Sequence, residues 1–233
     1  MIASDISIDA FRQAHEHVKE HAHHTPLMGS RSLSEASGFN AVLKAESFQR
    51  TGSYKIRGPL NKLAHMDEAE KQAGVICSSA GNHAQGVALA AALHGVRAVV
   101  VMAENATPSK IEATRAYGAE VVLHGSIWDE ANEKALELVE EQGLTYIHPF
   151  DDLDLITGQG TLGLEIYNDL PTVDTVVVPI GGGGLISGVS TVLKSLNPEI
   201  RIIGVESSGA PAMKRSVEAG QRELIGHEPP PEP

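Results

Sequence analysis

A lysine flanked by turn residues is the first feature of this sequence that could do chemistry. Residues 47–58 read SFQRTGSYKIRG, with Lys55 inside the run. Gly52 and Ser53 favour a turn followed by the start of a helix, and the neighbours of Lys55 are aromatic and β-branched. Burial and the positive end of a helix both disfavour an ammonium ion, so such a lysine can be a nucleophile near neutral pH. The alternative is a surface lysine in the first turn of a helix.

A run of four glycines could bind an anion. Residues 179–188 read PIGGGGLISG and lie between a β-branched segment and a predicted helix. Glycine lets the backbone approach a ligand closely and adopt the φ values that several inward-pointing amides require. These amides can converge on an anion at the positive end of the helix. We therefore interpret residues 181–184 as a cradle for a phosphate group, with a plain tight turn as the alternative.

The same glycine run has a rival interpretation as a dinucleotide-binding turn. Strand, glycine loop and helix are followed by Glu206 after about twenty residues, as in the nicotinamide-binding fingerprint. The register disagrees with it, because the third glycine position holds Ser187. A P-loop is also disfavoured, since it needs Gly-Lys followed by Ser or Thr. A monophosphate is the better ligand.

A third segment, SSAGNHAQG at residues 78–86, joins a predicted strand to a helix that begins near Asn82. The free amides at such a junction can bind a second anion. The alternative is a capped turn in which Asn82 only satisfies backbone groups. Cys77, immediately before this segment, is predicted to be a small core residue rather than a nucleophile.

The elements that must position these segments alternate along the chain. We predict a helix over residues 8–20 capped by Ser7, a short helix over 31–37 and a strand over 41–46. The alternation that follows is typical of a parallel sheet covered by helices. It predicts strands at 75–77, 97–102, 120–123, 175–178 and 201–206, and helices at 55–65, 82–94, 108–117, 126–142, 153–168 and 184–196.

Composition limits the classes of partner. The net charge of −12 and the absence of a basic stripe argue against a nucleic-acid partner. No apolar run approaches the roughly 18 residues of a membrane span, and no signal peptide is recognised, so we expect no membrane partner and a cytoplasmic location. The single cysteine excludes an internal disulfide. His17 and His21 have the spacing of metal ligands, but nothing completes a site, and we interpret them as a solvated face.

Together, and in this order, the three segments resemble those of the threonine/serine dehydratase family of fold-type-II pyridoxal-phosphate enzymes. The resemblance extends from about Thr25 to about Glu206. It implies an α/β fold like that of tryptophan synthase β, with two parallel-sheet domains. The large cofactor-binding domain would comprise residues 1–49 and 146–220, and the small domain residues 50–145. Family members are longer, so we expect the large domain to be incomplete and residues 221–233 to form an unstructured tail.

The resemblance also implies a reaction, in which L-threonine, and L-serine as a second substrate, is deaminated to 2-oxobutanoate or pyruvate and ammonia. The cofactor would be pyridoxal 5'-phosphate, held by the catalytic Lys55 as a Schiff base. The other implied cofactor contacts are Phe48, Asn82, Gly181, Gly182, Gly183, Gly184 and Leu185. The implied substrate contacts are Ser79, Ala80, Gly81, Asn82 and His83. Arg57 is expected to stabilise a helix or domain contact.

Two departures from related racemases narrow this expectation. Ala80 stands where the racemases carry a serine that can return a proton to the opposite face, so elimination is favoured over racemisation. Ala212 stands where their divalent-metal site has an acidic residue beside Glu206 and the carbonyl of Ala210, so we predict no metal site. The family is usually dimeric or tetrameric. The alternatives are a catalytically impaired remnant of the family and, less favoured, a nucleotide-binding oxidoreductase. The sequence does not separate degradation from isoleucine biosynthesis.

Overall fold

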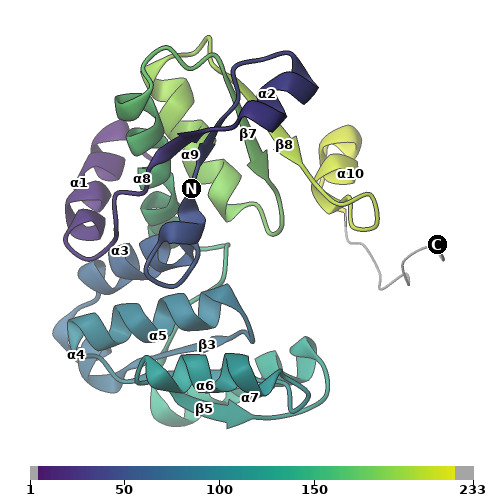
Figure 1. Cartoon of the computed structure of the whole chain (residues 1–233). Helices are drawn as coiled ribbons and strands as arrows, with labels where there is room; N and C mark the ends of the chain where they lie inside the picture. Colours follow the sequence, from purple (N-terminus) through teal and green to yellow (C-terminus); the bar gives the residue numbers. More distant parts are fainter. Residues whose placement is uncertain (1–4, 224–233) are drawn as a thin grey trace.

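The computed structural model describes residues 5–223, and its elements follow the predicted alternation (Figure 1). The helices are α1 (Ile8–Lys19), α2 (Arg31–Ser37), α3 (Arg57–His65), α4 (Glu68–Ala73), α5 (Asn82–His94), α6 (Pro108–Ala116), α7 (Trp128–Gln142), α8 (Leu153–Asp169), α9 (Gly184–Leu196) and α10 (Ala212–Ala219). The strands are β1 (Leu27–Gly29), β2 (Val42–Lys44), β3 (Val75–Ser78), β4 (Ala98–Met102), β5 (Glu120–Leu123), β6 (Thr145–Tyr146), β7 (Thr175–Pro179) and β8 (Arg201–Val205). Two 3-10 turns, η2 (Glu46–Phe48) and η3 (Tyr54–Ile56), precede α3.

A four-stranded parallel sheet forms the lower part of the molecule in Figure 1, in the order β5-β4-β3-β6. Successive side chains of a strand point to opposite faces, and here both faces are covered. Val75 and Cys77 of β3 belong to the core cluster that includes α5 residues, whereas Ile76 packs with buried residues of α7. This arrangement confirms the predicted α/β class with a parallel sheet.

The remaining strands form two small sheets in the upper part of Figure 1. Strands β7 and β8 pair in parallel, while β1 and β2 pair antiparallel. The four-stranded sheet uses residues 75–146, but the predicted domain limits themselves stay a prediction. Most of the predicted tail, residues 224–233, lies outside the described part of the chain. Within residues 5–223, the structure has no helix whose length and apolar character would let it cross a bilayer.

Helix α8 crosses the upper part of the molecule, and its backbone is in direct contact with the backbones of α3 and α9. A β-carbon added to Gly158 would lie 2.5 Å from the carbonyl oxygen of Arg57, at the start of α3. On the α9 side, a β-carbon on Gly188 would lie 2.4 Å from the carbonyl oxygen of Ile156. Both distances are shorter than van der Waals contact, so only glycine fits. Glycines thus let α8 pack directly against the backbones of α3 and α9.

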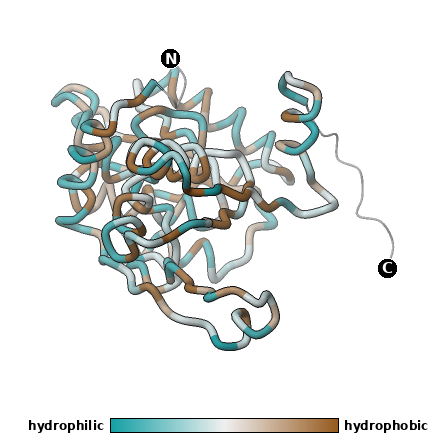
Figure 2. Tube along the Cα trace, turned by 90° about the horizontal axis from the view of Figure 1, so that it is seen from above, coloured by the Kyte–Doolittle hydropathy of each residue, from teal (hydrophilic) through white to brown (hydrophobic). Residues whose placement is uncertain are grey.

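Four elements were not predicted: β1, α4, β6 and α10. Each is short, so none has a long periodic pattern in the sequence. Helix α4 nevertheless has a local signal, because Asp67 and Glu70 form a reciprocal capping box. Helix α10 has no buried residue and stands apart at the side of the molecule (Figures 1 and 2).

The α8–α9 contact predicts a strong penalty for a small substitution. We expect Gly188→Ala to lower the free energy of unfolding by about 2 kcal/mol or more, because the added methyl group must push the two helices apart. Gly29→Ala is the matched control, since a β-carbon at Gly29 has no neighbour within 4 Å. Urea unfolding of both variants measures the difference, and equal midpoints would contradict this account of the contact.

Candidate active site

The lysine segment adopts the turn that its sequence predicts. Gly52 has a φ of 71°, and the hydroxyl of Ser53 accepts a hydrogen bond from the amide of Lys55 at 3.3 Å. Lys55 lies in the single 3-10 turn η3, and the α-helix begins only at Arg57 rather than at Lys55 itself. Helix α5 supports this turn from below. A β-carbon on Gly86 of α5 would lie 2.5 Å from the carbonyl oxygen of Lys55, so the backbone of Lys55 packs directly on α5.

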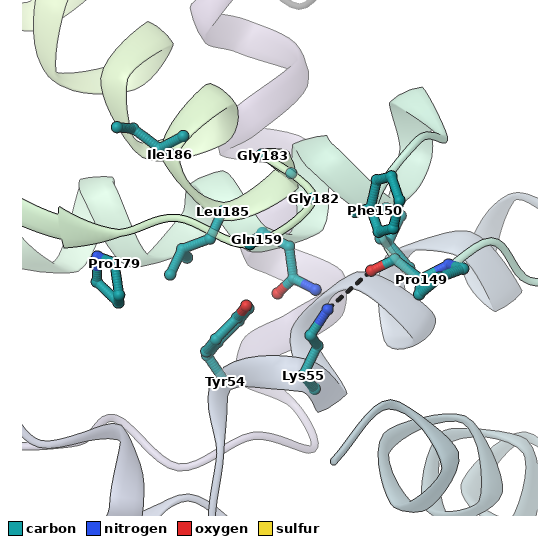
Figure 3. Close-up of a pocket in the computed structure, with 13 residues that line it drawn as sticks. Tyr54, Lys55, Pro149, Phe150, Gln159, Pro179, Gly182, Gly183, Leu185 and Ile186 are labelled. Carbon is teal, nitrogen blue, oxygen red and sulfur yellow. Dashed lines mark hydrogen bonds between the residues drawn. The ribbon is translucent and has the colours of Figure 1, made fainter. Parts of the chain in front are cut away.

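The side chain of Lys55 points into a cavity between η3 and the glycine loop (Figure 3). Its ammonium donates a hydrogen bond to the carbonyl oxygen of Pro149 at 2.8 Å and lies 5.5 Å from the centroid of the Tyr54 ring. Burial lowers the pKa of Lys55 below the ordinary value for lysine. The same cause raises the pKa of the Tyr54 hydroxyl, which therefore stays protonated at neutral pH. This lysine has the reduced basicity that the sequence analysis expected.

The cavity, of about 180 Å³, joins two of the three segments singled out from the sequence. Lys55 lies on one side, and Gly181–Gly184 with Leu185 form the other. The segment that precedes α8, with Pro149 and Phe150, and helix α8 itself close the space between them. The residues that line the cavity are Tyr54, Lys55, Pro149, Phe150, Leu155, Gln159, Pro179, Gly181, Gly182, Gly183, Gly184, Leu185 and Ile186.

The glycine loop has the geometry of an anion cradle. Helix α9 begins at Gly184, and the amide of Ser187 donates the first backbone hydrogen bond of the helix to the carbonyl of Gly183. The amides before Ser187 therefore face the positive end of the helix without an intrahelical partner. Gly183 has a φ of 91°, which disfavours any other residue. At Gly182 a β-carbon would overlap the ring of Phe150, at 2.2 Å. The loop thus fits a phosphate monoester.

Gln159 is a cavity residue that the sequence analysis missed. Its side chain is 1% exposed, and neither atom of its terminal amide has a hydrogen-bond partner in the described part of the chain. The available signal was a glutamine between two glycines, in the run LITGQGT. Pro149 and Phe150 also line the cavity and were not among the predicted site residues.

The third predicted segment, residues 78–83, does not line this cavity. Asn82 opens α5, and the hydroxyl of Ser79 accepts a hydrogen bond from the amide of Gly81 at 3.2 Å. Ala80 packs against the core cluster that includes the α5 residues. The predicted contacts of Asn82, Ser79, Ala80, Gly81 and His83 with cofactor or substrate stay predictions.

His83 connects that segment to the chain that holds Lys55. Its Nε2 atom donates to the carbonyl oxygen of Ile147 at 2.9 Å, two residues before Pro149. Its Nδ1 atom is buried and has no hydrogen-bond partner among residues 5–223. Burial lowers the pKa of His83 to about 4, although the hydrogen bond to Ile147 opposes the shift. His83 is therefore a neutral imidazole at pH 7.

Phe48 lies elsewhere. It was expected as a cofactor contact, but it is 59% exposed and does not line the cavity. Tyr54, the residue before Lys55, does line it. Phe48 lies in η2, where its carbonyl pairs with the imidazole of His23 at 3.2 Å. The structure therefore does not bring Phe48 to Lys55.

Arg57, next to the lysine turn, makes structural contacts, as predicted. It is fully buried and pairs with the carboxylates of Glu46 and Glu165, both at 2.7–2.8 Å. Those hydrogen bonds raise the pKa of the guanidinium against the opposing effect of burial. Lys44 binds Glu165 from the other side at 2.7 Å. This network ties α3, η2, β2 and α8 together beside the site.

The remaining candidate groups have structural surroundings. Cys77 is buried in β3, and burial raises the pKa of its thiol to about 12, which suits the predicted core residue. The carboxylate of Glu206 accepts hydrogen bonds from the amides of Met213 and Lys214 at the start of α10. His17 contacts the amide oxygen of Asn61 at 3.2 Å. Within residues 5–223, no group of three His, Cys, Asp or Glu side chains is placed to hold a metal ion.

Comparison with known proteins identifies the family of the chain. A family profile described as pyridoxal-phosphate dependent enzyme matches residues 18–230. The chain belongs to this family. The resemblance found from the sequence and the fold class are thereby confirmed, and the family membership supplies the cofactor, pyridoxal phosphate. The match does not support the dinucleotide-binding alternative, whose third glycine position holds Ser187.

Individual members of the family are similar to this chain over most of its length. It is 50% identical to an L-threonine ammonia-lyase of Thermotoga maritima over 224 residues, which are 96% of this chain and 56% of that protein. It superposes on the processed form of threonine deaminase isoform 2 from Solanum lycopersicum with a TM-score of 0.89, at 44% identity, covering 93% of this chain and 64% of the other. For a maize serine racemase the TM-score is 0.91 at 38% identity, covering 94% and 67%. The chain thus spans only part of the length of the proteins it matches.

The buried neutral His83 predicts a pH dependence of stability. Its pKa is about 4 in the folded chain and about 6.5 when unfolded, so the unfolded state binds more protons between these values. The contribution of His83 to the free energy of unfolding is fully present above pH 6.5 and decreases by about 3 kcal/mol as the pH falls to 4. His83→Gln keeps a donor for Ile147 but does not titrate, so its unfolding free energy should fall less over that window. Parallel profiles in urea titrations at several pH values would contradict the assignment.

Proposed function

We propose that this protein is a pyridoxal-phosphate dependent lyase that deaminates L-threonine to 2-oxobutanoate and ammonia, and L-serine to pyruvate and ammonia. One observation carries the proposal: a desolvated lysine and a glycine-rich helix N-terminus face one another across a single cavity. The names of the relatives at 44–50% identity, a threonine ammonia-lyase and a threonine deaminase, support the substrate class. Because the chain covers only 56–64% of those two proteins, the activity is a proposal for this chain.

The residues present fit the cofactor at both of its ends. Lys55 would hold its aldehyde carbon covalently, and the amides of Gly181–Gly184 would hold its phosphate. When bound, pyridoxal phosphate supplies an electron sink that makes the Cα proton of an amino acid labile. The phenol of Tyr54 and the apolar side chains of Leu155 and Leu185 exclude water from one side of the space.

Lys55 has the properties of the base that removes the Cα proton. Its lowered pKa increases the uncharged fraction near neutral pH, and proton transfer is most efficient when the pKa approaches the working pH. The carbonyl oxygen of Pro149 accepts a hydrogen bond from the amine of Lys55 at 2.8 Å and so orients it. The substrate then loses its β-hydroxyl as water, and hydrolysis of the resulting enamine returns one water and releases ammonia. The net change is the loss of ammonia alone.

Position 80 separates this proposal from racemisation. A racemase needs a proton donor on each face of the Cα carbon, whereas the methyl group of Ala80 cannot donate. The similarity to a maize serine racemase therefore supports the shared fold and cofactor but not the racemase product. Incubation with L-serine should yield pyruvate, and D-serine as the main product would contradict the proposal.

We also propose that the protein forms a homodimer or homotetramer. Sedimentation velocity tests this oligomeric state.

Lys55→Ala tests the central assignment. We expect wild-type protein mixed with pyridoxal phosphate to give a visible absorption band that borohydride converts to a stable, covalently labelled chain. Lys55→Ala should lose the band and the label, because it lacks the amine that binds the aldehyde. Lys110→Ala, an exposed lysine of α6, is the control and should keep both.

A coupled assay for 2-oxobutanoate completes the test. Labelled wild-type protein that produces 2-oxobutanoate from L-threonine supports the lyase, with loss of at least about 1,000-fold in rate expected for Lys55→Ala. Labelling without product would favour a catalytically impaired remnant instead. Equal labelling of wild type and Lys55→Ala would overturn the role of the lysine.

A further inference from the structure

The buried amide of Gln159 has no partner, which is costly unless a ligand supplies one. Its side chain is 1% exposed, and both Nε2 and Oε1 lack hydrogen bonds within the described residues. Buried polar groups in folded proteins are nearly always paired with protein or water. Gln49 shows the usual situation in this same chain: it is 4% exposed, its Oε1 accepts from the amide of His23, and its Nε2 donates to the carbonyl of His23.

The amide of Gln159 lies in the cavity beside the start of α3, where a β-carbon added to Gly58 would lie 2.7 Å from Nε2. Gly158 packs against the backbone of α3, and Gly160 packs against the ring of Phe11 and the backbone of α9, so the backbone of this turn of α8 is closely packed on both sides. In Figure 3 the amide lies between Lys55 and Tyr54 on one side and the Gly182–Leu185 loop on the other. Leu155, one helical turn earlier, makes the neighbouring surface apolar.

Among the groups around it, the cradle is the one that needs another donor. The ammonium of Lys55 already donates to the carbonyl of Pro149 and is itself a donor. A phosphate dianion has more acceptor positions than a few loop amides can fill, and hydrogen bonds to a charged acceptor are stronger than neutral ones. The Nε2 group of an amide offers two N–H bonds.

We propose that Gln159 is a phosphate-binding residue, whose Nε2 donates a hydrogen bond from α8 to a phosphoryl group seated on the amides of Gly181–Gly184. The inference deepens the proposed function, on which it rests for the identity of the phosphoryl compound. It makes the phosphate site three-sided: loop amides, helix end and a side-chain amide from a different helix.

Two substitutions of Gln159 test the donor role. Gln159→Met removes both polar atoms with a similar shape, and should raise the dissociation constant for pyridoxal phosphate and for inorganic phosphate about tenfold. Gln159→Glu keeps an acceptor but replaces the donor with a negative charge, and should weaken both probes more than the methionine does. Pyridoxal, which has no phosphate, should bind all three proteins equally.

The stability of the ligand-free protein gives a second readout. Removing a buried amide that has no partner should raise Tm of Gln159→Met by about 3 °C. The matched control is Gln49→Met, which removes an amide that makes three hydrogen bonds. That control should lower Tm by a similar amount and leave the dissociation constants unchanged.

The outcomes separate the inference from the proposed function. Unchanged affinity of Gln159→Met for both phosphate probes, or equal weakening for pyridoxal, would overturn the phosphate role of Gln159. Tighter or unaltered binding of the phosphate probes by Gln159→Glu would also overturn it. So would a lower Tm of ligand-free Gln159→Met combined with unchanged affinity for both phosphate probes. If borohydride fails to label Lys55 while phosphate binding still depends on Gln159, the proposed function fails and the inference stands.

Discussion

The backbone contacts of helix α8 are the constraint on which the site depends. Glycines let α8 approach α3 on one side and α9 on the other more closely than any side chain would permit. Helix α3 carries the lysine turn at its start, and α9 carries the glycine loop at its start. The width of the cavity is therefore set by two helix contacts rather than by the loops that line it. A site built this way keeps its two ends at a fixed separation, which a cofactor bound at both ends requires.

Buried charges strengthen the same arrangement. Arg57 lies two residues after Lys55, yet its guanidinium points away into carboxylates of Glu46 and Glu165. Each partner would be costly to bury alone, so the network stabilises only the arrangement in which α3, η2 and α8 meet. It also neutralises a positive charge that would otherwise lie beside the lysine. The pairing thus has consequences for the chemistry of the site as well as for its shape.

The sequence predicted the elements well and the site only in part, for different physical reasons. Helix and strand limits follow from caps and glycines that act locally, as at Gly38, Gly95 and Gly143, all of which have positive φ at helix ends. The meeting of Lys55 with Gly181–Gly184 came from family resemblance, because 126 positions separate Lys55 from Gly181 and no local pattern encodes the contact. Gln159 was missed because a polar residue in a helix looks solvated until the packing of that helix is known. Phe48 was placed at the site by resemblance alone, and in this structure it faces outward.

The charges around the cavity explain how an acidic protein can bind an anion there. The net charge is −12, but among the described residues that line the cavity there is no carboxylate, and Lys55 is the one cation. Amide donors hold a phosphate at short range through partial charges, so they do not add a second cation that would lower the pKa of Lys55 further. A bound phosphate acts in the opposite direction and raises that pKa, against the effect of burial. Neutral donors on the loop, together with the proposed donor on α8, would therefore hold a phosphate without removing the basicity that Lys55 needs to accept a proton.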